Sequence, residues 1–368
     1  MILKSISILN YKNIEQVDLN LSNKLNCFVG QNGEGKTNLL DAICYMAFCK
    51  SAFSINNSQT IRHGEDFMTI QGIFETQNGD EEKIHCALRN GGKKIIRRND
   101  KVYSKLADHI GLIPLVIISP QDTSLITGGS EGRRHFMDMV ISQYDALYSH
   151  EVIRYRNALQ QRNALLRVPD SYPDEDMLSI YESIMADSGK IVYNCRKNFI
   201  EKFIPIFIST YQQLGESREK ISLRYKSCCN DDLDLATILQ NGRKKDFVLG
   251  HTLHGLHRDD LEMELNDYDI KYEGSQGQVK TFLTSLKFAQ FYFMKQQYKD
   301  KTPILLLDDI FDKLDAFRVN RILQMVSSDE FSQIFITDTK RQFLEGIISR
   351  INSDYKFFGV EKGNITEL

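Results

Sequence analysis

The most informative segment of the sequence is Gly30-Gln31-Asn32-Gly33-Glu34-Gly35-Lys36-Thr37. It matches GxxxxGK(S/T) and lies between an apolar run that predicts a buried strand over 25–29 and helical spacing over 38–48. The glycines let the backbone curl so that successive N–H groups point at phosphate oxygens, and the helix N-terminus adds partial positive charge. Lys36 is expected to reach the β- and γ-phosphates, and the Thr37 hydroxyl to ligate Mg²⁺. We therefore expect residues 30–37 to bind ATP with Mg²⁺.

A second apolar run ends in two carboxylates. Ile304–Leu307 predicts a buried strand, and Asp308 and Asp309 follow it. Asp308 is expected to hold the Mg²⁺ shell, usually through water, and Asp309 to orient or deprotonate the attacking water. Apolar runs that end in Asp are common, so this pattern gains its meaning from the nucleotide loop. Together they make Lys36 and Asp309 the expected catalytic residues.

A third motif, Ser275-Gln276-Gly277-Gln278, precedes a helix predicted over 278–298. It offers a hydroxyl and N–H groups to an anion, although an ordinary helix cap has the same pattern. The order of nucleotide loop, SQGQ, helix, apolar strand with two Asp, and then 312–315 is that of ATP-binding cassettes. In cassettes the signature of one protomer closes on the nucleotide held by another. Lys36 and Ser275 are much further apart than in an ordinary cassette, so an insertion is implied.

Periodicity predicts the rest of the architecture. Runs typical of strands occur at 2–9, 14–21, 68–76, 82–90, 112–118, 221–226, 261–271 and 333–337. Helical spacing covers 131–167 and 176–203, with Pro169 and Pro173 between them, which predicts an antiparallel helical arm.

The expected fold is α/β, an ABC-type P-loop ATPase head. Lobe I, a mixed sheet around the P-loop helix, is expected over 1–115 and 295–368. An inserted, mainly helical lobe II is expected over 116–294, with the helical arm at about 131–210 and the signature.

The composition is that of a globular protein. The chain has 368 residues, of which 42% are hydrophobic and 26% charged. A net charge of −3 excludes a strongly basic coat, so any nucleic-acid binding must come from local patches. Seven Cys without a CxxC pair favour reduced thiols. The N-terminus does not fit a signal peptide and the apolar runs are too short to span a membrane, so we expect a cytoplasmic protein without a membrane partner.

Four further motifs complete a specific resemblance. They are Leu9-Asn10-Tyr11-Lys12-Asn13, Ser119-Pro120-Gln121-Asp122, Gly132-Arg133-Arg134-His135-Phe136-Met137-Asp138 and His257-Arg258-Asp259-Asp260. Over its whole length the chain resembles the RecF family of bacterial DNA recombination and repair ATPases, which is related to the heads of SMC proteins and Rad50. The resemblance implies an ATP-dependent clamp or loader on single-stranded and duplex DNA at gaps and junctions, acting in gap repair, replication restart and SOS induction. It also implies an ATP-dependent homodimer, slow DNA-dependent ATP hydrolysis, and RecR with RecO as partners.

The resemblance adds roles for individual residues. Gln121 resembles the Q-loop residue that senses Mg²⁺ and the γ-phosphate. Lys12 stands where the family pattern has Arg, so it is expected to contact ATP phosphate as a point charge. Asp309 replaces the Glu of most cassette ATPases, and the shorter carboxylate implies slow hydrolysis, as in a switch. Asp338 follows the strand where transporters have their switch His.

Other interpretations stay open at this stage. A transporter cassette usually carries LSGGQ and a switch His, whereas this chain has SQGQ at 275–278 and Asp338 at the switch position. An SMC or Rad50 subunit needs hundreds of coiled-coil residues. An OLD-type nuclease needs a Toprim-like domain after the 312–315 motif, and a P-loop GTPase needs NKxD.

Two charged clusters also have two interpretations each. His254 and the HRDD motif fit a polar structural network better than a metal site. The basic residues of 93–105 fit either a solvated hairpin or a surface that contacts DNA phosphates. They are Lys93, Lys94, Arg97, Arg98, Lys101 and Lys105.

Overall fold

The computed structural model describes residues 1–54, 56–168, 173–215, 219–229, 234–298, 300–311, 316–348 and 354–368. The chain divides into two compact units. The first unit is Met1–Asp122, Gln213–Gly215 and Lys280–Leu368, and the second is Thr123–Gln212 and Glu216–Val279. The boundaries therefore lie after Asp122 and Val279, where the sequence placed them after residues 115 and 294.

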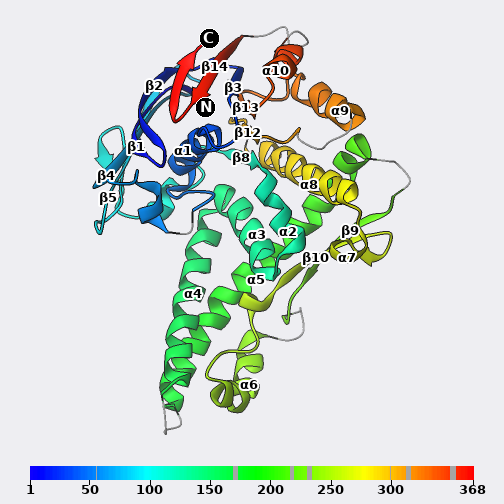
Figure 1. Ribbon diagram of the computed structural model, residues 1–368. Coiled ribbons are helices and arrows are strands. Elements are labelled where there is room, and N and C mark those ends of the chain that lie inside the picture. The colour runs from blue at the N-terminus through cyan, green and yellow to red at the C-terminus, as the bar shows by residue number, and fades with distance from the viewer. Residues whose placement is uncertain are drawn as a thin grey trace. The chain divides into compact units, whose positions relative to one another are not determined.

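Two six-stranded sheets form the first unit within the described residues (Figure 1). The mixed sheet has the order β15-β14-β3-β13-β12-β8, and only β15 is antiparallel to its neighbour. Its strands are β3 (Leu25–Val29), β8 (Leu115–Ile118), β12 (Ile304–Asp308), β13 (Ile334–Asp338), β14 (Tyr355–Glu361) and β15 (Asn364–Glu367). Pairing of β8 with β12 explains why 116–118 belongs to this unit rather than to the predicted lobe II.

The second sheet is antiparallel, in the order β2-β1-β4-β5-β6-β7. Its strands are β1 (Ile2–Tyr11), β2 (Ile14–Asn20), β4 (Phe67–Glu75), β5 (Glu81–Arg89), β6 (Ile95–Arg98) and β7 (Lys101–Val102). Buried Gln333 joins the two sheets, because its Nε2 donates to the carbonyl oxygens of Leu3 and Ser22 at 2.9 and 2.8 Å.

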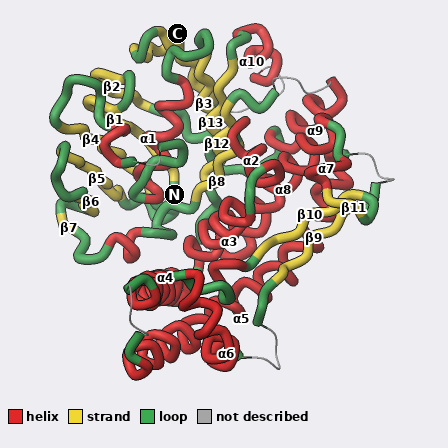
Figure 2. Tube along the Cα trace, turned by 60° about the horizontal axis from the view of Figure 1, so that its bottom comes forward, coloured by secondary structure: helices red, strands yellow, loops and turns green. Residues whose placement is uncertain are grey.

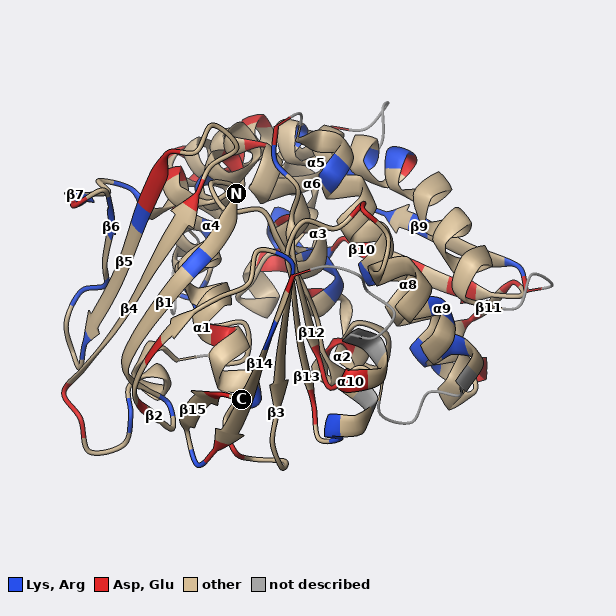
Figure 3. Ribbon diagram, turned by 90° about the horizontal axis from the view of Figure 1, so that it is seen from above, with Lys and Arg blue, Asp and Glu red and all other residues tan. Residues whose placement is uncertain are grey.

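The P-loop helix α1 (Lys36–Phe48) lies between the two sheets (Figure 3). Its residues from Leu39 to Phe48 are all buried, as expected of a helix that is covered on every side. Shorter helices complete this unit. They are η1 (Asn57–Thr60), η2 (Leu106–His109), η3 (Pro120–Thr123, which ends at the boundary), α9 (Ala316–Val326) and α10 (Arg341–Ile348).

The second unit is mainly helical. Its helices are α2 (Ser124–Thr127), α3 (Ser130–Tyr144), α4 (Ala146–Leu166), α5 (Glu175–Leu214), α6 (Leu235–Leu249), η4 (Leu256–Arg258), α7 (Ile270–Glu273) and the start of α8 (Gln276–Gln297). A small antiparallel sheet has the order β11-β10-β9, with β9 (Ile221–Lys226), β10 (Asp260–Leu265) and β11 (Tyr268–Asp269).

Helices α4 and α5 lie side by side and form the predicted arm (Figure 2). The sequence predicted one helix over 131–167, and this was wrong. Asp145 interrupts it with an extended backbone, and its carboxylate caps α4 by accepting the N–H of Tyr148 at 2.9 Å.

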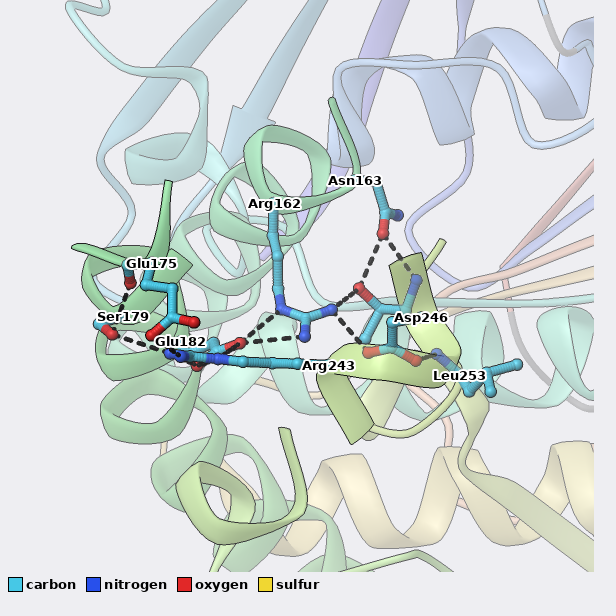
Figure 4. Close-up of polar contacts among 9 residues, drawn as sticks. Arg162, Asn163, Glu175, Ser179, Glu182, Arg243, Asp246 and Leu253 are labelled. Atoms are coloured by element: carbon cyan, nitrogen blue, oxygen red, sulfur yellow. Dashed lines mark hydrogen bonds and ion pairs between the residues drawn. The ribbon is translucent and has the colours of Figure 1, made fainter. Parts of the chain in front are cut away.

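Helix α6 is attached to the arm by buried ion pairs (Figure 4). The guanidinium of Arg162 is fully buried and donates to Glu182 at 3.0 Å, to Asp246 at 2.8 Å and to Thr252 at 2.7 Å, while Arg243 donates to Glu182 at 2.7 Å. Removing one partner of such a buried pair costs about 3–5 kcal/mol. Periodicity did not predict α6 because its attachment rests on these charges more than on an apolar stripe.

Two expectations about the whole chain concern membranes and thiols. Among the described helices, none has the length and apolarity that a membrane crossing requires. All seven cysteines are free thiols, as predicted, and the Sγ atoms of neighbouring Cys228 and Cys229 are 4.0 Å apart.

Candidate nucleotide site

Three glycines give the nucleotide loop its path. Gly33 and Gly35 have φ values of +87° and +114°, which strain any residue with a Cβ. A Cβ on Gly30 would lie 2.3 Å from the carbonyl oxygen of Val360 in β14. The loop therefore needs glycine at these positions both for its curl and for its close approach to the neighbouring strand.

Two turns of the first unit hold the loop from outside. Asn13, between β1 and β2, donates from Nδ2 to the Glu34 carbonyl oxygen at 3.0 Å and accepts from Asn38 Nδ2 at 2.7 Å. The N–H of Gly363, between β14 and β15, donates to the same Glu34 oxygen at 2.8 Å. Sequence reasoning gave neither Asn13 nor Gly363 a role, although Asn13 stands in a quoted motif and Lys362-Gly363-Asn364 is a turn signal.

Lys36 folds back over the loop. Its Nζ donates to the carbonyl oxygens of Gly30 at 2.8 Å and Gln31 at 3.2 Å, and lies 3.6 Å from Asp309 Oδ2. The backbone of Asp309 has a φ of +44°, and its N–H donates to Thr337 Oγ1 at 3.0 Å. A positive φ at a residue other than glycine costs about 1–3 kcal/mol of backbone strain, and residues with such strain cluster at functional sites. The structure thus brings together the two expected catalytic residues.

Thr37 and Asp308 also lie together. The Thr37 hydroxyl is 2.9 and 3.0 Å from the two carboxylate oxygens of Asp308, and Thr337 donates to Oδ1 at 2.8 Å. Burial raises the pKa of the Asp308 carboxyl because it disfavours the charged form. A cation bound beside the carboxylate would offset this cost. A hydroxyl and a carboxylate are the hard oxygen ligands that Mg²⁺ takes, so this pair fits the predicted metal.

The position of Lys12 differs from that of the loop residues. Its Nζ is 2.6 Å from Oδ2 of buried Asp41 in α1. Asp41 also accepts from the hydroxyls of Tyr11 at 2.7 Å and Ser51 at 2.6 Å, and from the N–H of Ala52 at 2.7 Å. Contact of Lys12 with ATP phosphate stays a prediction, and the observed partner is a carboxylate on the P-loop helix.

Gln121 lies in η3, directly after β8, and is exposed. Because β8 runs parallel to β12, with Ile118 beside Leu307, Gln121 follows the same sheet edge that carries Asp308. Its neighbour Asp122 accepts from Lys287 Nζ at 3.3 Å. The role of Gln121 at Mg²⁺ stays a prediction.

The signature begins helix α8. Ser275 Oγ accepts the N–H of Gln278 at 3.3 Å, while Gln278 Oε1 accepts the N–H of Ser275 at 2.8 Å. This reciprocal pair is a capping box, the structural alternative that the sequence also allowed. Ser275, Gln276 and Gly277 are exposed. The 312–315 motif lies outside the described residues.

Comparison with known proteins decides the family. The family described as RecF/RecN/SMC N terminal domain matches residues 2–365. The chain is 53% identical over 367 residues to the DNA replication and repair protein RecF of Phocaeicola vulgatus, an alignment that covers 100% of this chain and 98% of that protein. The chain belongs to the RecF family. The family predicted from the sequence is thus confirmed, and the family is one of DNA replication and repair proteins.

Solved structures confirm the fold of this RecF-family chain. The recombination mediator protein RecF-ATP of the RecFOR pathway matches with a TM-score of 0.90 at 26% identity, over 100% of this chain and 97% of that one. The Smc head domain from Pyrococcus furiosus, bound to the C-terminal domain of ScpA, matches with a TM-score of 0.58 at 18% identity, over 100% and 96%. That match shows the ABC-type head fold alone. A transporter cassette is not favoured.

Two of the RecF-like motifs form one polar network in the second unit. Arg133 pairs with Asp260 at 2.6 Å, and buried Arg196 pairs with Asp138 at 2.9 Å and Asp259 at 2.8 Å. Among the described residues, no cluster of His, Cys, Asp and Glu is arranged to hold a metal ion. The ion pairs link the GRRHFMD and HRDD motifs, so HRDD takes part in a polar network.

His257 of the HRDD motif is held in its neutral form. Its Nε2–H donates to the carbonyl oxygen of Thr252 at 3.0 Å, so Nδ1 accepts from the Tyr155 hydroxyl at 3.0 Å. Burial lowers the pKa of His257 to about 4. Both ring nitrogens are therefore occupied at neutral pH.

The basic cluster of 93–105 separates into two groups. Lys94 donates to the Cys49 carbonyl oxygen and lies 5.1 Å from the centre of the Tyr45 ring, and Arg98 pairs with Glu82. Lys93, Arg97, Lys101 and Lys105 are exposed. Arg98 is exposed as well, but its charge is paired with Glu82, and Lys94 is half-buried. The predicted contact with DNA phosphates would therefore rest mainly on the second group.

Proposed function

We propose that this chain binds and hydrolyses ATP with Mg²⁺ and uses ATP to control its binding to DNA during recombinational repair. The main support for this proposal is the complete nucleotide loop with the Thr37–Asp308 pair, in a chain that matches a RecF protein over its whole length. The solved relative named RecF-ATP supports ATP as the nucleotide.

The geometry suggests how the residues act. The loop N–H groups and the start of α1 bind phosphate oxygens, and Lys36 exchanges the carbonyls of Gly30 and Gln31 for the β- and γ-phosphates. Thr37 and Asp308 would hold Mg²⁺, which neutralises phosphate charge when bound. Asp309 orients the attacking water and accepts its proton. As an Asp it reaches less far than a Glu, which fits slow hydrolysis.

Closure of the site requires a second copy. The exposed Ser275 and Gln276 at the start of α8 would contact ATP held by the nucleotide loop of the second copy, which gives an ATP-dependent homodimer. DNA then binds at gaps and junctions and stimulates hydrolysis. The RecFOR pathway named for the solved relative supports RecR and RecO as the protein partners.

The test is equilibrium binding of a labelled gapped duplex with ATP and Mg²⁺, with ADP, and without nucleotide. We expect tight binding only with ATP, a steep loss of affinity with salt, and little binding by K36A under any condition. Steady-state ATP turnover with and without the same DNA measures the stimulation. Equal DNA binding by the wild type with and without ATP would overturn the proposal.

A further inference from the structure

The signature residue Gln278 is held at both ends of its side-chain amide. Its Oε1 accepts the N–H of Ser275 at 2.8 Å, and its Nε2 donates to Oε1 of Glu219 at 2.7 Å. A carboxylate only accepts hydrogen bonds, so Glu219 requires the Nε2 end of the amide to face it. That choice leaves the Oε1 end facing Ser275, which is the orientation that the capping box needs.

Glu219 is itself anchored. Its second carboxylate oxygen accepts from the hydroxyl of Tyr211, which is 1% exposed and lies near the end of α5. The Tyr211 ring packs against Phe207, with 6.3 Å between the ring centres. A buried hydroxyl on a packed ring therefore fixes the position of the carboxylate, and the negative charge of Glu219 suits the nearby N-terminus of α8.

The arrangement has a consequence for Ser275. Its N–H is occupied by Gln278 Oε1, and its Oγ accepts the N–H of Gln278 at 3.3 Å. A hydroxyl that accepts in this way keeps its own proton for another acceptor, and Ser275 is exposed. The capping box thus presents an oriented O–H donor at the surface.

We propose that Glu219 is a positioning residue for the signature. It orients the Gln278 amide, and through the capping box it aims the Ser275 hydroxyl at the γ-phosphate of ATP held by a second copy. The inference rests on the proposed function, because it requires that the signature acts in trans. Nothing in the sequence marks Glu219, which lies far from the signature along the chain.

The main test is E219L, which removes both acceptor oxygens at similar volume. ATP binding to its own nucleotide loop is expected to match the wild type, since Lys36 and Thr37 are unchanged. ATP-dependent dimerisation and hydrolysis are expected to fall by roughly tenfold, the value of one lost hydrogen bond to a charged group. E219Q is the matched control, because its amide oxygen still accepts from Gln278 while its amide N–H donates to the Tyr211 oxygen. E219Q is expected to retain both activities.

Mixing separates a signature defect from a folding defect. E219L mixed with K36A forms one intact composite site, from the loop of E219L and the signature of K36A, so hydrolysis is expected to recover to about half per dimer. E219L mixed with S275R contains no intact signature, so hydrolysis is expected to stay at or below the residual rate of E219L alone. If E219L is poorly folded, Q278M removes the same link and enters the same assays.

The outcomes distinguish the two proposals. Normal ATP-dependent dimerisation and hydrolysis by S275R would overturn the trans signature itself. Loss of dimerisation in S275R together with wild-type behaviour of E219L would overturn only the role of Glu219. Failure of K36A to restore hydrolysis to E219L would also overturn it, because the defect would then not act through the signature.

Discussion

The nucleotide loop and the signature differ in how completely the chain holds them. Lys36 is buried against loop carbonyls, Thr37 meets Asp308, and two turns support the loop from outside. Ser275 instead lies exposed at a helix start and is held by one capping box. The binding chemistry is thus assembled within one chain, whereas the closing chemistry is presented to solvent. This difference is what a site completed by a second copy requires.

The largest expected effect comes from K36A. The substitution removes the ammonium that we propose contacts two phosphates, and each charge-assisted hydrogen bond contributes about 1.5–3 kcal/mol. We expect ATP affinity to fall by at least about a hundredfold without loss of the folded state. Equilibrium binding of a labelled ATP analogue measures the first and thermal unfolding the second. Near wild-type affinity would show that the loop is not the nucleotide site.

D309N tests whether ATP binding and ATP hydrolysis are separable within the nucleotide site. Asn tolerates the positive φ of this position and keeps the N–H bond to Thr337, but it loses the charge. We expect ATP binding to persist and single-turnover hydrolysis to slow by about a hundredfold or more. ATP-bound dimers should then accumulate. An unchanged single-turnover rate would assign the water to another residue.

The basic cluster offers a matched pair of variants for the DNA surface. K93A/R97A removes two exposed charges, whereas K94A/R98A removes charges that already pair within the protein. On duplex DNA the slope of log K against log salt should become shallower by about 1.8 for K93A/R97A if each contacts a phosphate, and change little for K94A/R98A. Equal slopes in the wild type and K93A/R97A would place the DNA surface elsewhere.

The smallest effect is an opposite pH dependence in the two units. Burial lowers the pKa of His257 from 6.5 in the unfolded chain to about 4 in the folded protein. Between pH 6.5 and pH 4 the imidazole is therefore protonated in the unfolded chain but not in the folded protein, so acidification lowers the stability of the fold. Burial raises the pKa of Asp308 above 3.8, so its protonation on acidification favours the folded state. In urea unfolding, the midpoint concentration of the wild type should fall between pH 7 and pH 5, and H257Q should show a smaller fall. A loss as large as in the wild type would show that His257 does not contribute.

The nucleotide loop was predictable because its residues are contiguous and each has a chemical reason for its place. Gly33, Lys36, Thr37 and the two Asp at the end of β12 all lie where their motifs suggested. The strand periods also predicted most of both sheets. β14 was not predicted, because Phe357 and Phe358 are both buried and break the alternation.

Contacts between segments that are distant along the chain could not be predicted from the sequence. Nothing in the order of residues pairs Glu219 with Gln278, or Gly363 with Glu34, since these contacts depend on where separate turns meet. The Lys12–Asp41 pair was missed for the same reason. The end of α3 at Asp145 was missed because the apolar spacing continues through this residue. Asp145 ends the helix by its extended backbone and caps the next helix with its carboxylate.

The central claim is that the nucleotide loop of one copy and the signature of another share one ATP. The most direct measurement is the mass in solution, by light scattering, of D309N and of D309N/S275R with ATP and Mg²⁺. A shared ATP predicts the mass of two chains for D309N and of one chain for D309N/S275R, with equal ATP occupancy in both. Dimers of D309N/S275R under these conditions, or monomers of D309N at full ATP occupancy, would contradict it.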